Sequence, residues 1–324
     1  MKLPLIKGAT LAGILAFGAS SALAGDALTV VSWGGAYTKS QIEAYHKPYT
    51  AKYGTKIQSE DYNGGLAEIR AQVEAGKITW DVVDLEVSDA ARGCDDGLFE
   101  KISAGSLPNG VNGALPAKDF IPGALQECAV GTIVWSTIYA YDADKYKSKQ
   151  PKTISDFFDT KKFPGKRGMR KVPKVNLEWA LMADGVDGRD VYKGLATKAG
   201  QDRAFKKLDT IKDDVLWWEA GAQPPQMLAD GEVVMTSAYN GRIFNAAVTE
   251  KKNFEIVWDR QLFSFDLYAI IKGTPRLKEA LRYVQFSTAS EQLANQARWI
   301  SYGPTRKSSI KLISTHATAG IKMM

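Results

Sequence analysis

The chain has few of the side chains on which metal sites and many enzymes depend. Its 324 residues include only two histidines, His46 and His316, and two cysteines, Cys94 and Cys128. Zinc sites take Cys and His ligands in groups of three or four, so this scarcity disfavours a metal centre. The sequence also contains no G-x-S-x-G nucleophile elbow, no H-E-x-x-H pair and no P-loop. We therefore expect no enzyme, no metal and no cofactor.

No stretch is apolar over the roughly 20 residues that a membrane-spanning helix requires. The run from Ala9 to Ala19 is shorter, follows Lys2 and Lys7, and precedes Ala22-Leu23-Ala24. A short apolar run between basic residues and a small-x-small site is typical of a secretory signal peptide. We expect cleavage after Ala24, which removes two lysines and no acid and lowers the net charge from +6 to +4.

Export changes the interpretation of the two cysteines. Neither Cys94 nor Cys128 stands in a C-x-x-C motif or beside a histidine. In an oxidising compartment an isolated pair forms a disulfide more often than a redox or metal site. We expect a Cys94–Cys128 disulfide, worth about 3–4 kcal/mol on the chain-entropy argument. Two buried free thiols are the alternative.

Basic side chains concentrate between Lys145 and Lys174, where the only acids are Asp156 and Asp159. Nucleic-acid binding calls for aromatic stacking residues or a recognisable module among such charges. The segment shows neither, so we interpret it as a solvated face and expect no nucleic-acid partner. A surface for a protein partner is the alternative.

The apolar pattern predicts alternating strands and helices. Strand-like runs occur at residues 28–33, 80–85, 131–141, 233–236, 254–258 and 267–271, and helical spacing at 66–73, 205–211, 277–286 and 291–297. Thr153 to Asp156 is typical of a capping box that opens a helix. The β-α-β order predicts parallel strands with crossover helices. We expect two α/β lobes rather than one very large sheet.

Acidic and aromatic residues stand at the ends of several expected elements. These residues are Trp33, Tyr37, Asp84, Glu86, Glu178, Tyr239 and Asp266, of which Asp266 opens the 267–271 strand and Glu178 opens a helix. Ligands of α/β sheets gather at the carboxyl ends of strands. Carboxylates accept hydrogen bonds from an ammonium group, and aromatic faces attract it by ~0.5–2 kcal/mol each. Together the residues indicate a cation site, whereas each alone is an ordinary core or turn residue.

Six segments carry a resemblance to a known family. They are Ser32-Trp33-Gly34-Gly35-Ala36-Tyr37, Trp80-Asp81-Val82-Val83, Trp135-Ser136-Thr137, Ala238-Tyr239-Asn240-Gly241-Arg242, Asp266-Leu267-Tyr268-Ala269-Ile270 and Tyr302-Gly303-Pro304-Thr305. Over residues 27–305 the chain resembles the periplasmic substrate-binding proteins of ABC transporters, in the spermidine/putrescine-binding branch. The resemblance implies a bilobal α/β fold of the type II, Venus-flytrap kind, with two lobes joined by crossing strands. It also implies a monomer in the periplasm that delivers its ligand to an inner-membrane ABC permease.

The expected division follows from this fold. Residues 1–24 form the signal peptide, residues 25–135 and 266–303 the first lobe, and residues 136–265 and 304–324 the second lobe. Relatives continue with further helices, but the sequence after Pro304 has no helical apolar pattern. We therefore expect a shortened end to the second lobe.

The resemblance implies that Trp33, Tyr239 and Asp266 contact a small cationic metabolite such as putrescine or spermidine. Asp266 would pair with an ammonium group while Trp33 and Tyr239 hold the aliphatic chain. Tyr37 and Glu86 are further candidates. Glu178 lies near the position of an acid in the second lobe and would hold the distal ammonium.

Three departures from the family keep other ligands open. Tyr239 stands where polyamine binders commonly have Trp, and Ser264 replaces an aromatic residue, although Phe265 is adjacent. Arg242 follows the Asn-Gly pair and could face a ligand carboxylate. An amino-acid-like ligand such as GABA, or an aminophosphonate, is therefore the alternative to a diamine. A secreted α/β hydrolase is an alternative of another class, and an iron binder is a third, although the chain has no Tyr-Tyr pair.

Overall fold

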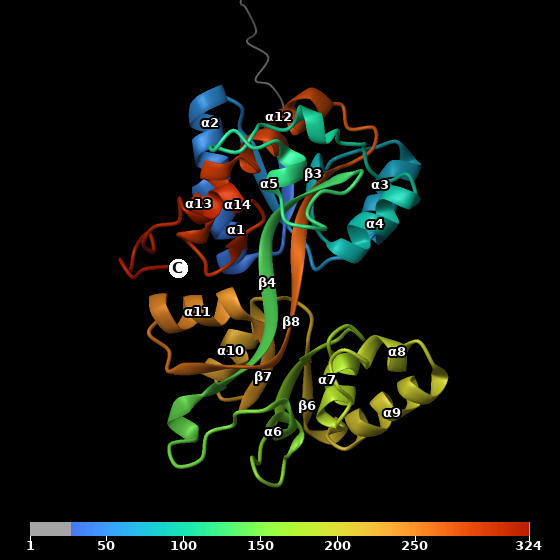
Figure 1. Ribbon diagram of the computed structural model, residues 1–324, viewed down its shortest axis with the longest axis vertical. Helices are drawn as coiled ribbons and strands as arrows, with labels where there is room; N and C mark the ends of the chain where they lie inside the picture. The colour runs from blue at the N-terminus through green and yellow to red at the C-terminus, as the bar shows by residue number, and fades with distance from the viewer. Residues whose placement is uncertain (1–26, 324) are drawn as a thin grey trace, which may run out of the picture.

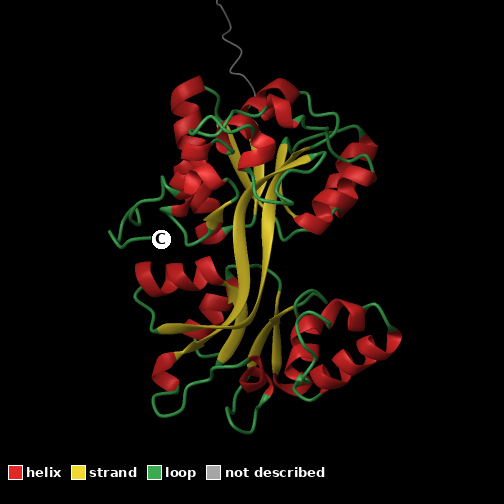
Figure 2. Ribbon diagram, in the orientation of Figure 1, coloured by secondary structure: helices red, strands yellow, loops and turns green. Residues whose placement is uncertain are grey.

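The computed structural model describes residues 27–323, so the expected signal peptide lies outside the described residues. The molecule is elongated and has two halves, each with helices packed around strands (Figures 1 and 2). Two long strands, β4 (Ala129–Asp142) and β8 (Phe254–Ile270), run side by side through both halves. The bilobal α/β fold is confirmed, and β4 and β8 are its crossing strands.

The first half holds the beginning of the described chain and most of its end. Its strands are β1 (Leu28–Ser32), β2 (Ile57–Asp61), β3 (Val82–Glu86) and β9 (Gly303–Pro304). Its helices are α1 (Gly35–Gln41), η1 (Ile42–His46), α2 (Lys47–Tyr53), α3 (Ala67–Ala75), α4 (Val87–Asp95), η2 (Ala104–Ser106), α5 (Pro116–Asp119), α12 (Leu277–Ser287), α13 (Ser290–Ala297) and α14 (Lys307–Ile310).

The second half holds the middle of the chain. Its strands are β5 (Arg167–Arg170), β6 (Val215–Trp218) and β7 (Met235–Tyr239). Its helices are η3 (Ala143–Lys145), α6 (Ile154–Phe158), α7 (Asn176–Ala183), α8 (Val191–Leu195), α9 (Lys198–Asp209), η4 (Lys212–Asp214), α10 (Gln223–Ala229) and α11 (Asn240–Thr249). The expected capping box is confirmed at the start of α6, where Thr153 and Asp156 satisfy each other's backbone N–H groups.

The described strands form one mixed sheet rather than the expected parallel one. Their order is β2-β1-β3-β8-β4-β7-β5-β6, with β9 beside β4. Neighbours are parallel within β2-β1-β3 and within β7-β5-β6, but β8 runs antiparallel to both β3 and β4. The reason is that β4 leads from the first half to the second and β8 leads back. The run at 254–258 and all but the last residue of the run at 267–271 are part of β8, so Asp266 lies inside a strand and does not open one.

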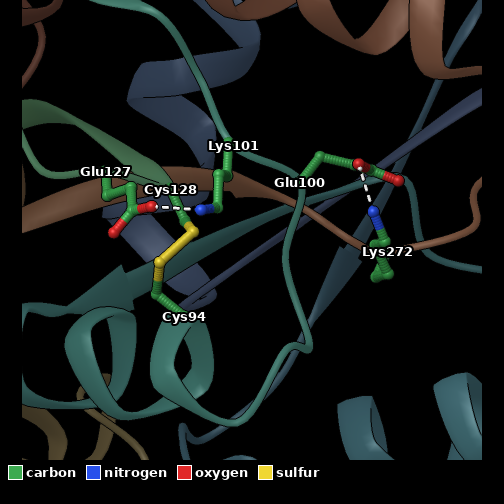
Figure 3. The surroundings of a disulfide bond; sticks show 6 residues. All are labelled: Cys94, Glu100, Lys101, Glu127, Cys128 and Lys272. Carbon is green, nitrogen blue, oxygen red and sulfur yellow. Dashed lines mark hydrogen bonds and ion pairs between the residues drawn. A yellow bond between two sulfur atoms is a disulfide. The ribbon is translucent and has the colours of Figure 1, made fainter.

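The expected disulfide is confirmed in the first half. Cys94, on α4, is bonded to Cys128, which directly precedes β4 (Figure 3). Two ion pairs lie nearby, between Lys101 and Glu127 at 2.5 Å and between Lys272 and Glu100 at 2.9 Å. The bridge therefore ties α4 to the strand that leaves this half.

Two ionisable side chains, those of His46 and Arg167, are buried, and the second corrects the interpretation of the basic segment. His46 is 5% exposed and packs near the ring of Tyr283, and burial lowers its pKa to about 4. Arg167, in the basic segment, is fully buried and donates to the carbonyl oxygens of Phe157 and Phe163. The basic segment is therefore not a uniformly solvated face.

The exact lobe boundaries stay a prediction, but the contacts of residues 305–308 favour the first half for that segment. Arg306 Nη1 lies 3.0 Å from an oxygen of Asp119, and the Ser308 N–H donates to the same carboxylate at 2.9 Å. Thr305 donates to the carbonyl oxygen of Gly131. The expected division placed this segment in the second lobe, where it would lack these partners.

Candidate functional site: two chambers between the halves

Two adjoining cavities lie where the halves meet. The first, called the small chamber, holds about 20 Å³ and is lined by Trp33, Tyr37, Glu86, Ile133, Trp135, Tyr239, Arg242, Asp266 and Tyr302. The second, called the large chamber, holds about 280 Å³ and extends along the second half to Glu178 and Tyr192. Glu86, Trp135 and Tyr239 line both chambers. Water needs about 10–15 Å³ of such space, so the small chamber alone takes one group of about that size.

The structure brings most of the candidate residues together. Trp33, Tyr37, Glu86, Tyr239 and Asp266 all line the small chamber. Glu178 lies apart from Trp33 and Asp266, in the large chamber. That these side chains bind a ligand stays a prediction. Their shared cavity is the geometry that the prediction requires.

Glycines give the aromatic residues room around the small chamber. After β1 the chain turns through Gly34 at φ 73°, a conformation that an L side chain rarely adopts, and this turn places Trp33 beside the chamber. At the start of α11, Asn240 accepts the Ser136 N–H at 2.9 Å and donates to the Ser301 carbonyl at 2.7 Å. A Cβ on Gly241 would lie 2.5 Å from the ring of Tyr302, so glycine allows that close approach.

Asp266 lies on β8, in the part of the strand that passes between the two halves, and its side chain lines the small chamber. It is paired with Ile133 of β4, next to a register shift, and such irregularities often re-aim side chains beside sites. The Trp135 Nε1–H donates to Asp266 Oδ1 at 2.7 Å. Burial, and then the neighbouring carboxylates of Asp84 and Glu86, raise the pKa of Asp266 well above its usual range. Among residues 27–323, Asp266 forms no ion pair.

Glu86 is already paired with cations of the second half. Arg170 Nη1 lies 2.7 Å from Glu86 Oε1, and Lys174 Nζ lies 2.5 Å from Oε2. Burial acts to raise the pKa of Glu86, but Arg170 and Lys174 outweigh it and lower the pKa. A ligand ammonium would have to compete with both cations. Glu86 therefore acts here as a contact between the halves.

Arg242 is the cation of the small chamber. Its Nη1 and Nη2 donate to the carbonyl oxygens of Gly34 and Trp33 at 3.0 and 2.9 Å, across the boundary between the halves. Its Nε is buried with no hydrogen-bond partner, and within the described chain the side chain has no carboxylate partner. The chamber thus holds one acid and one cation, neither of which forms an ion pair within the described residues, although Arg242 acts to lower the pKa of Asp266.

Sequence reasoning left Trp135, Arg170 and Tyr302 out of the site. Trp135 and Tyr302 stood in segments that resemble the family, so the resemblance was a usable signal. Arg170 ends the four-residue strand β5, and its position at the carboxyl end of a strand was hidden because that strand is so short. Arg170 belongs to the basic segment, and its charge alone does not indicate that its side chain faces the site.

Within residues 27–323 no group of three or more His, Cys, Asp or Glu side chains is placed to hold a metal ion. In the same range no helix has the length and apolar character needed to cross a membrane.

Comparison with known proteins identifies the class. The profile of the family described as "Bacterial extracellular solute-binding protein" matches residues 44–322. The gamma-aminobutyric acid-binding protein of Pseudomonas aeruginosa is 44% identical over 299 residues, which cover 92% of this chain and 82% of that protein. The chain thus has the fold and the interlobe cavity of a solute-binding protein, and it belongs to the bacterial extracellular solute-binding protein family.

Solved structures agree with this membership. The binding protein MotA from A. tumefaciens B6, in complex with glucopine, is 30% identical with a TM-score of 0.81, over 89% of this chain and 86% of that one. The Atu4243 GABA receptor is 32% identical with a TM-score of 0.75, over 89% of this chain and 86% of that one. The protein is a substrate-binding protein of the ABC-transporter type and not an enzyme. These comparisons do not support the expected polyamine specificity.

Proposed function

We propose that this protein binds a small zwitterion, of which GABA is the model, in the periplasm and delivers it to an inner-membrane ABC permease. In this proposal Asp266 pairs with the ammonium group and Arg242 with the carboxylate. Trp33 and Tyr239 pack against the aliphatic chain. The sequence analysis kept GABA as the alternative ligand to a diamine, and GABA now becomes the leading ligand.

One observation carries the proposal. The small chamber is lined by a buried carboxyl group, Asp266, and a buried guanidinium, Arg242, neither of which forms an ion pair in the described chain. A buried charge without a partner is costly, so a ligand that supplies both missing charges gains from each. A zwitterion supplies both, and its charges have the required signs.

The same charges argue against a diamine. Putrescine would satisfy Asp266, but its second ammonium would lie in a site that already contains the cations Arg170, Lys174 and Arg242. Of the other acids that line the chambers, Glu86 is bonded to two of these cations, and Glu178 lies in the large chamber with Lys174, where burial raises its pKa. Like charges in a site of low dielectric constant repel strongly. The relatives named above as binding GABA support the same choice.

The aromatic side chains fit an aliphatic chain between two charges. Tyr239 packs edge-on against Trp135, with ring centroids 4.9 Å apart, and against Trp218 at 5.8 Å. A ligand longer than one water-sized group must also occupy part of the large chamber, where these rings lie. Because both halves line the site, a bound ligand favours the closed arrangement over an open one.

Isothermal titration calorimetry on protein refolded after removal of copurified ligand tests the proposal. The probes are GABA, putrescine, n-butylamine and butyrate, of which only GABA carries both charges. We expect GABA to bind at least about 30-fold more tightly than the other three, since losing one buried charged partner costs about 2–5 kcal/mol. Putrescine binding as tightly as GABA would contradict the zwitterion assignment. Failure of all four would contradict GABA as the model ligand.

A further inference from the structure

Three carboxylates lie on one face of the sheet beneath the ligand site. Asp84 and Glu86 are two residues apart on β3, so their side chains point to the same face. Glu86 is directly paired with Asp266 on β8, and Asp84 is paired with Tyr268. Residues opposite and diagonal across antiparallel strands share a face, with diagonal neighbours about 7–8 Å apart. Asp84 and Asp266 are such diagonal neighbours.

Two of the three carboxylates have no cation bonded to them. Glu86 is neutralised by Arg170 and Lys174. In the described chain neither Asp84 nor Asp266 forms an ion pair, although they are only 0% and 6% exposed. Two uncompensated carboxylates at this separation and burial do not both remain ionised readily, because each raises the cost of charging the other.

The surroundings of Asp84 fit a protonated carboxyl. Its Oδ2 accepts hydrogen bonds from the Tyr37 hydroxyl and the Gln41 amide. Its Oδ1 is buried and has no hydrogen-bond partner, and the Gln41 Oε1 is also buried without one. Burial raises the pKa of Asp84 and outweighs Tyr37, Gln41 and Trp33, which act to lower it. An ionised oxygen left unpaired in the interior is costly, whereas a proton on Oδ1 removes the charge.

Nearby cations compensate the pair only in part, since burial and the neighbouring carboxylates raise the pKa of Asp266 and outweigh Arg242, which acts to lower it. The tyrosines coupled to Asp84 or Asp266 all have pKa values raised by burial, so they are neutral between pH 5 and 8: Tyr37, Tyr45, Tyr62, Tyr239, Tyr268, Tyr283 and Tyr302. Arg242 forms no ion pair with either carboxyl within the described residues, and its two terminal nitrogens bond to backbone carbonyls. Burial raises the pKa of Asp84 to about 7, in keeping with this arrangement.

We propose that Asp84 and Asp266 hold one proton between them in the ligand-free protein and that the ligand's ammonium group expels it. The proposal rests on the proposed function, since it requires an ammonium at Asp266. The ammonium brings a positive charge that compensates the second carboxylate, and the proton leaves to solvent. Ligand binding is then linked to proton release, and affinity rises with pH over the range in which the free pair is protonated. Asp84 thereby acts on ligand binding through Asp266 and does not touch the ligand.

Calorimetry with GABA in buffers of different ionisation enthalpy measures the linked proton directly. At pH 6 we expect close to one proton released per GABA bound, falling towards zero at pH 8.5. The dissociation constant falls by up to tenfold per pH unit over that range. In Asp84→Asn we expect Asp266 to be ionised before binding, so that no proton is released and affinity changes less than twofold between pH 6 and 8. Glu43→Gln, which removes a carboxyl on the surface of η1, is the matched control and keeps the release.

A measurement without ligand separates this proposal from the proposed function. Infrared spectroscopy of the ligand-free protein at pH 6 shows a protonated-carboxyl band that Asp84→Asn loses and Glu43→Gln keeps. Absence of that band overturns the shared proton, as does GABA binding with no proton release at any pH from 5.5 to 8. If the band is present and GABA does not bind, the assignment of GABA fails while the protonated pair stands.

Discussion

Replacing Arg242 by glutamine tests most directly whether its guanidinium pairs with the ligand carboxylate in the small chamber. The guanidinium is 4% exposed and has no ion-pair partner within the described residues, so the carboxylate of the ligand is its expected counter-charge. Removing one member of a buried, hydrogen-bonded charge pair costs about 2–5 kcal/mol. We expect Arg242→Gln to weaken GABA binding by about 30-fold to several thousand-fold.

Part of this loss has another source. Arg242 also donates to the Trp33 and Gly34 carbonyls across the boundary between the halves, so the variant closes less favourably around any ligand. n-Butylamine, which lacks the carboxylate, measures that second contribution alone. Calorimetry with GABA and n-butylamine on the wild type and on Arg242→Gln completes a double-mutant cycle. The cycle yields the coupling free energy between Arg242 and the ligand carboxylate. Arg203→Gln, which removes an exposed arginine paired with Asp184, is the matched control.

One result would refute the reasoning. Equal loss of affinity for GABA and n-butylamine in Arg242→Gln would mean that the guanidinium acts only in closure. The ligand carboxylate would then have another partner, and the cations that line the large chamber are Arg170 and Lys174.

Three further changes test the closure contact, the buried histidine and the disulfide. Glu86→Gln removes the partner of Arg170, and we expect roughly 10- to 150-fold weaker GABA binding, because such charged hydrogen bonds contribute about 1.5–3 kcal/mol. We also expect a larger radius of gyration by X-ray scattering, and an unchanged radius would contradict this role. Glu219→Gln, which removes one member of an exposed ion pair, is the control. His46 has a pKa of about 4 when folded against about 6.5 when unfolded, so its contribution to stability is present above pH 6.5 and is lost as pH falls towards 4. Urea unfolding at pH 7 and 5 is expected to show His46→Gln losing about 2 kcal/mol less than the wild type over that interval, and equal losses would contradict it. Cys94→Ser with Cys128→Ser opens a loop of 34 residues, and we expect unfolding to cost about 3–4 kcal/mol less, with no further effect of a reducing agent.

Local patterns in the sequence determined a large part of the fold. Apolar runs at 28–33 and 80–85 marked β1 and β3, helical spacing marked α12 and α13, and Thr153 with Asp156 marked the start of α6. These features depend on neighbouring residues, which the sequence states directly. The pairing of Cys94 with Cys128 followed from there being only two cysteines.

The candidate site was only partly readable. Trp33, Tyr239 and Asp266 were found by resemblance and by their places beside strands, and they do line one chamber. The role of Glu86 could not be predicted from the sequence, because its partners Arg170 and Lys174 lie 84 and 88 residues further along the chain. The same holds for Arg242, whose acceptors lie over 200 residues away at Gly34 and Trp33.

The sequence by itself thus determined much of the secondary structure, the bilobal class and most residue types of the site, but not the mixed sheet or the length of β8. The tertiary structure alone decided which charges are already paired and which are not. Burial and ion pairing depend on contacts between distant segments, and β4 and β8, by crossing between the halves, create those contacts. For that reason we propose that Asp266 and Arg242 face the ligand while Glu86 does not, and that the ligand is a zwitterion rather than a diamine.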